Sequence, residues 1–179
     1  MAAPGPEPTA PGPSVRPLVV GLGHPARHDD AFGLEVADRL ARDLGGRCDV
    51  RRCPSDGTEL LDLWGGRDLV VVIDAVSAGG APGSIYRLEV GDLPIPPPFR
   101  GTSTHGFSIA EVIALARSLD RLPRRLLLFG VEGASFAPGL GLSPPVAPAV
   151  EAVARRVVEE LGRSTPPHDA IPREGRGRA

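Results

Sequence analysis

Three short polar segments of this sequence hold side chains that could meet at one metal ion. Residues 21–33 form a glycine-rich stretch that ends with two adjacent acids, Asp29 and Asp30. Asp74 follows an apolar run, and His105 lies among small polar residues in segment 101–106. Each segment stands at the end of a predicted strand or just before a predicted helix. Their chemistry depends on whether the fold brings them together.

Each segment also has a simpler interpretation. Asp29 and Asp30 stand at a predicted helix start, where carboxylates are favoured by the helix dipole. Asp74 could be a loop-capping aspartate, although an ionised carboxylate at the end of an apolar strand needs hydrogen bonds or a cation to offset its lost hydration. His105 could be an ordinary solvated histidine of a loop.

The elements around these segments predict an α/β fold. Apolar runs predict strands, and apolar residues at helical spacing predict helices. Because the two alternate, we expect a three-layer sandwich, a mostly parallel twisted sheet of about five strands with helices on both faces. Ligands bind such sheets beyond the carboxyl ends of the strands, where Asp30, Asp74 and residues 101–106 are expected. The predicted strands are 18–20, 47–53, 69–73, 84–90 and 125–131.

Capping signals mark where the predicted helices begin. A helix over residues 30–44 ends at the Gly45-Gly46 pair. Two capping-box spacings and one cap followed by proline open the other three helices. The pairs are Asp56 with Glu59, Ser108 with Glu111, and Ser143 with Pro144.

Composition predicts one folded domain between two tails. The 179 residues contain 23 Gly and 21 Pro, and the prolines gather at the ends and in loops. We predict a disordered Pro-rich tail over residues 1–16, a folded domain over 17–162 and a disordered tail over 163–179. A secretory signal and an apolar stretch of about 18 residues are both lacking, so we expect a cytoplasmic protein that does not bind membranes.

The net charge limits which partner molecules are expected, and the cysteine spacing predicts the state of the thiols. A net charge of −2, with arginine and histidine as the only basic residues, offers no basic face for nucleic acid. We expect a monomer. Cys48 and Cys53 are spaced to point to opposite faces of a strand, which predicts buried free thiols.

Taken together, the motifs resemble those of the hydrogenase maturation endopeptidases. The resemblance runs over about residues 18–161 in the same order and spacing, and it leaves both tails unexplained. Each motif alone is weak, but the combination is specific. The matching stretches are the glycine turn with Asp29-Asp30, Val72-Ile-Asp-Ala, Ser103-Thr-His105, and Gly130-Val-Glu-Gly with Leu142-Ser143.

The resemblance implies that Asp30, Asp74 and His105 are the metal-contacting and catalytic residues. Two carboxylates and an imidazole leave coordination positions open for substrate or water. Two departures stand out: His24 replaces a common asparagine, and Asp30 replaces a common glutamate. The shorter carboxylate should still reach a metal, while His24 puts one local hydrogen bond of the turn in doubt.

The resemblance also implies a substrate. The enzyme would remove the C-terminal extension of a [NiFe] hydrogenase large-subunit precursor, using nickel already held by the precursor's cysteines. Nickel supplied by the substrate implies no permanently bound cofactor. Asp30 or Asp74 would help to activate the attacking water. The sequence lacks the motifs of a self-sufficient protease centre, which fits this dependence.

Four neighbouring residues are assigned lesser roles. We interpret Asp29 as the helix-start neighbour that positions Asp30, and Ser143 as a helix cap. Glu132 ends the fifth predicted strand and is either a surface glutamate or a residue that orients a ligand. His28 is an additional candidate ligand.

Three rival functions remain open at this point. Gly21-x-Gly23-x-x-Ala26 fits a relaxed dinucleotide fingerprint, although Pro25 and the two acids suit a pyrophosphate poorly. The same turn is similar to that of peptidyl-tRNA hydrolases, against which the lack of a basic surface argues. A non-catalytic chaperone that holds the hydrogenase precursor is the third.

Overall fold

The sheet has five strands, as the sequence predicts. In a computed structural model, which describes residues 16–54, 59–92, 94–99 and 108–164, the strand order is β2-β1-β3-β5-β4. All neighbouring strands are parallel except β4, which runs antiparallel to β5 at the edge. The strands are β1 Leu18–Leu22, β2 Asp49–Cys53, β3 Leu69–Val76, β4 Ile85–Glu89 and β5 Arg125–Glu132.

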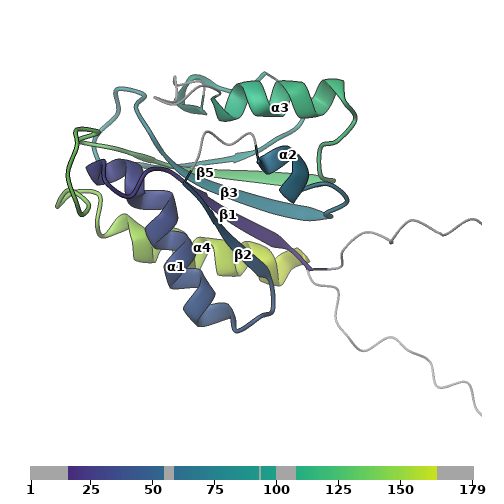
Figure 1. The fold of residues 1–179 in the computed structure, drawn as a ribbon, viewed down its shortest axis with the longest axis horizontal. Helices are drawn as coiled ribbons and strands as arrows, with labels where there is room; N and C mark the ends of the chain where they lie inside the picture. The colour runs from purple at the N-terminus through teal and green to yellow at the C-terminus, as the bar shows by residue number, and fades with distance from the viewer. Residues whose placement is uncertain (1–15, 55–58, 93, 100–107, 165–179) are drawn as a thin grey trace, which may run out of the picture.

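Helices cover both faces of this sheet, which confirms the three-layer α/β sandwich. Helices α1 (Phe32–Leu44) and α4 (Ala149–Ser164) lie on one face, and α2 (Leu60–Leu63) and α3 (Ile109–Ser118) lie on the other (Figure 1). Two short 3-10 helices, η1 (His28–Ala31) and η2 (Pro97–Phe99), complete the described elements. The start of β1 and the end of α4 lie at one end of the sheet, and α1 begins at the other.

The core is divided between the two faces by the alternation of side chains along the strands. In β3, Val71 and Ile73 pack with α1 and α4, whereas Val70 and Val72 pack with α2 and α3. A strand covered on both faces reads as a continuous apolar run, which is why β3 is easy to recognise in the sequence. Cys48 and Cys53 are free, buried and on opposite sides of the sheet, as predicted.

Local signals predicted some helix ends correctly and others not. The capping box of Ser108 and Glu111 opens α3 as expected. The predicted cap at Ser143 is wrong, because α4 begins only at Ala149. Pro148 lacks an amide hydrogen and disfavours the helical conformation of the residue before it, so residues 144–148 form turns instead. The expected capping residue Asp56 lies outside the described residues, and α2 begins at Leu60.

Two further boundaries differ from the prediction. β3 continues to Val76, so Asp74 lies within the strand and pairs with Gly130 of β5 rather than following the strand's end. The apolar pattern resumes with Ala75 and Val76, and both are buried. Helix α4 continues to Ser164, two residues beyond the predicted limit at 162. In the described part of the chain, no helix has the length and apolar character that crossing a membrane requires.

Candidate functional site

The glycine turn after β1 places the start of α1 directly on the ends of two strands. Gly23 has a φ of +130°, and a side chain there would overlap the carbonyl oxygen of Asp30. A side chain at Gly33 would overlap the carbonyl oxygens of Leu22 and Ile73, which belong to β1 and β3. The two glycines therefore allow segment 28–33 to lie against the carboxyl ends of these adjacent strands.

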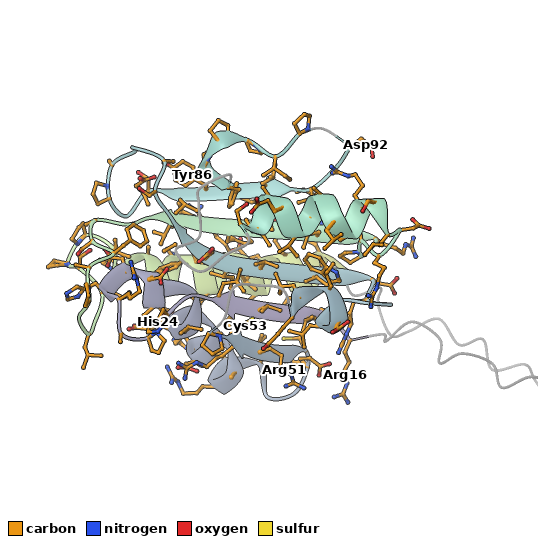
Figure 2. The ribbon with its side chains drawn as sticks, turned by 45° about the horizontal axis from the view of Figure 1, so that its top comes forward. Arg16, His24, Arg51, Cys53, Tyr86 and Asp92 are labelled. Carbon is orange, nitrogen blue, oxygen red and sulfur yellow. The ribbon has the colours of Figure 1, made fainter. Side chains whose placement is uncertain are left out.

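His24 restores the hydrogen bond that its substitution for asparagine put in doubt. Its Nδ1 accepts a hydrogen bond from the backbone N–H of Ala26 at 3.2 Å. The side-chain oxygen of asparagine makes the same bond, two residues ahead, in an Asx-turn. Figure 2 shows His24 at the end of the molecule where α1 begins, far from Arg16 at the other end. The departure therefore preserves the local turn.

Asp30 is presented by η1 with only part of its side chain exposed. The side chain is 17% exposed, and its Oδ2 lies 3.8 Å from Nε of Arg27 in an ion pair. That Nε is buried and has no hydrogen-bond partner among the described residues. At this distance the ion pair is weak.

Asp74 lies on the neighbouring strand and is electrostatically coupled to Asp30. Its Oδ1 accepts a hydrogen bond from the N–H of Ala75 at 2.8 Å. Burial and the negative charge of Asp30 raise the pKa of Asp74 to about 7, and the bond from Ala75 offsets only part of this. The structure thus brings these two predicted residues together, because η1 rests on the ends of β1 and β3.

The third predicted ligand is not tested by this structure. His105, together with all of segment 101–106, lies outside the described residues. Within the described ranges, no three His, Cys, Asp or Glu side chains are grouped to hold a metal ion. The set of Asp30, Asp74 and His105 therefore remains a prediction, of which the acid pair is now placed.

Asp29, interpreted from the sequence as the helix-start neighbour that positions Asp30, also binds a loop that is distant in the chain. It is fully buried, and its carboxylate accepts hydrogen bonds from four donors of the loop between β5 and α4. Burial alone would raise the pKa of Asp29, but these bonds outweigh it and hold the pKa below its usual value. The donors are the backbone N–H groups of Ala134 (2.8 Å), Ser135 (2.9 Å) and Ser143 (2.7 Å), and the hydroxyl of Ser143 (2.8 Å).

Ser143 therefore binds Asp29 rather than capping α4. The sequence reasoning missed this pairing, although the family motifs contain both residues. The signal that could have predicted the pairing is a second acid directly before a candidate ligand. If that acid is buried, its carboxylate needs hydrogen-bond donors from elsewhere in the chain.

Glu132 is a buried residue, so the interpretation as a surface glutamate is wrong. It is 3% exposed and accepts hydrogen bonds from the backbone N–H groups of Ala78 and Gly79, both at 2.9 Å. The hydroxyl of Tyr86 donates a third bond at 3.0 Å. Glu132 thus fastens the segment that follows β3, just as Asp29 fastens the loop after β5.

His28 contacts the same loop as Asp29. Its φ is +43°, its N–H donates to the carbonyl oxygen of Gly139 at 3.0 Å, and its Nδ1 lies 3.1 Å from the carbonyl oxygen of Gly141. A side chain at Gly139 would overlap the imidazole ring. His28 therefore helps to hold the loop between β5 and α4. These contacts explain its position without a bound metal.

Comparisons with known proteins agree with this fold and motif set. A family model described as hydrogenase maturation protease matches residues 54–160. The hydrogenase 2 maturation protease of Escherichia coli K12 is 32% identical over 164 residues, which cover 89% of this chain and 98% of that protein. A putative hydrogenase maturation protease of Methanocaldococcus jannaschii is 28% identical, with 80% and 95% covered.

Solved structures show the same architecture. The hydrogenase maturating endopeptidase HybD of E. coli superposes with a TM-score of 0.72 at 28% identity, covering 84% of this chain and 94% of that chain. The [NiFe] hydrogenase maturation protease HycI of Thermococcus kodakarensis gives a TM-score of 0.61 at 26% identity, with 83% and 93% covered.

Proposed function

This chain belongs to the hydrogenase maturation protease family, and on that premise we propose that it is an endopeptidase that trims a nickel-loaded [NiFe] hydrogenase large-subunit precursor. The bond cut would release the C-terminal extension of the precursor. The observation that carries the nickel part of this proposal is the coupled pair of Asp30 and Asp74 at the carboxyl edge of the sheet.

This pair is arranged to favour a cation. Because the pKa of Asp74 is about 7, its carboxyl group is about half protonated at neutral pH. A divalent ion would displace that proton and relieve both the burial cost and the mutual repulsion. Oδ2 of Asp74 accepts no hydrogen bond from the described residues, so it is available to such an ion.

The proposed set of two carboxylates and one imidazole leaves coordination positions open, which suits a visiting metal. We propose that the nickel arrives bound to the cysteines of the precursor and that Asp30, Asp74 and His105 complete its coordination. An enzyme with no metal of its own would then recognise whether the precursor has been loaded. No permanently bound cofactor is proposed.

The proposed reaction is hydrolysis of a single peptide bond. The shared nickel orients the scissile peptide, and one carboxylate accepts a proton from the attacking water. Asp74 is a candidate for this base, because its pKa lies close to neutral pH. The proton then passes to the departing amine as the C–N bond breaks.

Mass spectrometry of the precursor before and after incubation with the protein tests this proposal. We expect loss of one defined C-terminal peptide from nickel-loaded precursor and no change in nickel-free precursor. Equal cleavage of both would refute the recognition of nickel. Cleavage of neither would refute the peptidase assignment.

Alanine substitution of Asp30, Asp74 and His105, one at a time, separates a peptidase from a chaperone. A peptidase loses cleavage in each variant, whereas a chaperone tolerates all three. Asp62→Ala is the matched control, because the Asp62 side chain lies on α2 and is 87% exposed.

A further inference from the structure

Residues 134–143, in the loop between β5 and α4, include three large apolar side chains with different surroundings. Phe136 and Leu142 pack against the core beneath α1 and α4. Leu140 is 80% exposed, the most exposed of the large apolar side chains in the described residues. The others that are exposed lie in or next to helices: Leu115 and Leu119 at α3, and Val158 in α4. Among the exposed large apolar side chains of the described ranges, only Leu140 projects from a loop.

This loop is held in place along its length. Asp29 binds the loop near both of its ends, at Ser135 and Ser143. Between them, the N–H of Gly139 donates to the carbonyl oxygen of Ala26 at 3.0 Å, and the N–H of His28 donates to the carbonyl oxygen of Gly139 at 3.0 Å. Leu140 is therefore a fixed apolar projection.

The attachment also fixes the loop relative to the acid pair. Residues 26–29, which bind the loop, lead directly into Asp30. A substrate segment held against Asp30 would thus lie beside the loop. Gly141, with a φ of +78°, turns the chain back immediately after Leu140.

We propose that Leu140 is an apolar anchor that docks the enzyme to the folded precursor beside its C-terminal extension. This inference rests on the proposed function, since it assigns the precursor as the partner. The complementary surface is an apolar recess that accepts one leucine side chain. Because the backbone of this loop is already held in place, binding costs little further backbone freedom. Most of the free energy gained by burying Leu140 should therefore appear as affinity.

Leu140→Ser tests this anchor, and Leu119→Ser is the matched control. Leu119 is 52% exposed where α3 ends, beside the start of β5 and so at the opposite end of the sheet. With nickel-loaded precursor, we expect Leu140→Ser to raise KM about tenfold and to change kcat by less than about twofold. Leu119→Ser should leave both unchanged, and Leu140→Met should restore most of the affinity.

Binding to nickel-free precursor isolates docking from cleavage. We expect Kd for this precursor to rise about tenfold in Leu140→Ser, while the midpoint of thermal unfolding stays the same because Leu140 buries little surface. Unchanged KM and Kd would overturn the anchor, although wild-type cleavage would still support the proposed function. Failure of the wild type to cleave would instead overturn the proposed function.

Sedimentation of the protein alone tests the alternative that Leu140 contacts a second copy of the chain. We expect the wild type and Leu140→Ser to sediment alike. A wild-type dimer that dissociates in Leu140→Ser would overturn the proposal by assigning Leu140 to self-association.

Discussion

Asp29 and Glu132 share one edge of the sheet with Asp30 and Asp74, but the two pairs meet different environments. The first pair is fully enclosed, and each carboxylate accepts hydrogen bonds from a loop. In the second pair Asp74 accepts a bond from Ala75, and burial together with the negative charge of Asp30 raises its pKa to about 7. We call these the fastening acids and the open acids.

The contrast shows that backbone donors decide what a buried carboxylate does. Asp29 and Asp30 are consecutive in the chain, yet loop N–H groups lower the pKa of Asp29, while the charge of Asp30 adds to burial in raising the pKa of Asp74. A carboxylate whose lone pairs are satisfied stabilises the fold and is unavailable for chemistry. One that accepts few hydrogen bonds, as Asp74 does, costs stability when ionised and can bind a cation or a proton.

Replacing an open acid should have the largest effect on activity. We expect Asp74→Asn to reduce cleavage of nickel-loaded precursor by about 10³-fold, because the variant cannot accept a proton and binds a cation weakly. Its stability at pH 8 should rise, since an ionised carboxylate with few donors is removed. Rates from mass spectrometry and urea unfolding measure both effects. A stability loss like that of a fastening acid would contradict the comparison.

Replacing a fastening acid should have the largest effect on stability. We expect Asp29→Asn to lose about 3 kcal/mol of unfolding free energy, because an amide presents only one acceptor oxygen to four donors and turns an N–H group toward them. Ser143→Ala removes only one of these bonds, so it should cost about 1 kcal/mol. Equal losses in the two variants in urea would show that the carboxylate is not the centre of the network.

Glu132→Gln should cost less than Asp29→Asn, about 1–2 kcal/mol by urea unfolding. Glutamine can still accept the bonds from Ala78 and Gly79 through one oxygen, and the hydroxyl of Tyr86 can rotate to accept instead of donating. Cleavage of the precursor should be retained. Loss of cleavage without loss of stability would place Glu132 among the open acids.

Asp74 and Asp29 should contribute to stability with opposite dependence on pH. Asp74 has a folded pKa of about 7 against an ordinary 3.8, so its cost to stability appears as pH rises between these values. The pKa of Asp29 is lowered, so its contribution is complete above about 3.8 and is lost as pH falls through the folded pKa. Titration of ¹³C-labelled carboxyl groups by NMR measures both.

The rate of cleavage, measured as kcat/KM against pH, should follow the titration of Asp74. We expect kcat/KM to fall about tenfold per pH unit below about 7, as Asp74 of the free enzyme becomes protonated. Asp30→Asn should lower the pKa of Asp74 in the NMR titration, because the neighbouring negative charge is removed. An unchanged pKa would show that the two acids are not coupled.

The smallest expected effect concerns the turn that supports the open acids. His24→Asn should change stability by less than about 0.5 kcal/mol, because both side chains accept the N–H of Ala26. His24→Ala removes the acceptor and should cost about 1 kcal/mol. A larger loss in His24→Asn would mean that the imidazole ring has a packing role that asparagine cannot supply. Thermal unfolding measures both variants.

The sequence by itself determined the layered fold and the placement of the open acids. Apolar runs identify the strands because a covered parallel strand is apolar on both faces. Asp30 and Asp74 follow from that, since adjacent strands bring their carboxyl ends together. The sequence could not place the end of β3 or the start of α4, because pairing with β5 and the turns around Pro148 override the local pattern.

Only the tertiary structure decided which acids are fastened. The partners of Asp29 lie 105 to 114 residues away, and those of Glu132 lie 46 to 54 residues away. Most of these partners are backbone N–H groups, which every residue except proline carries, so no residue type marks them in the sequence. The role of each acid is therefore set by which loops the fold brings against it.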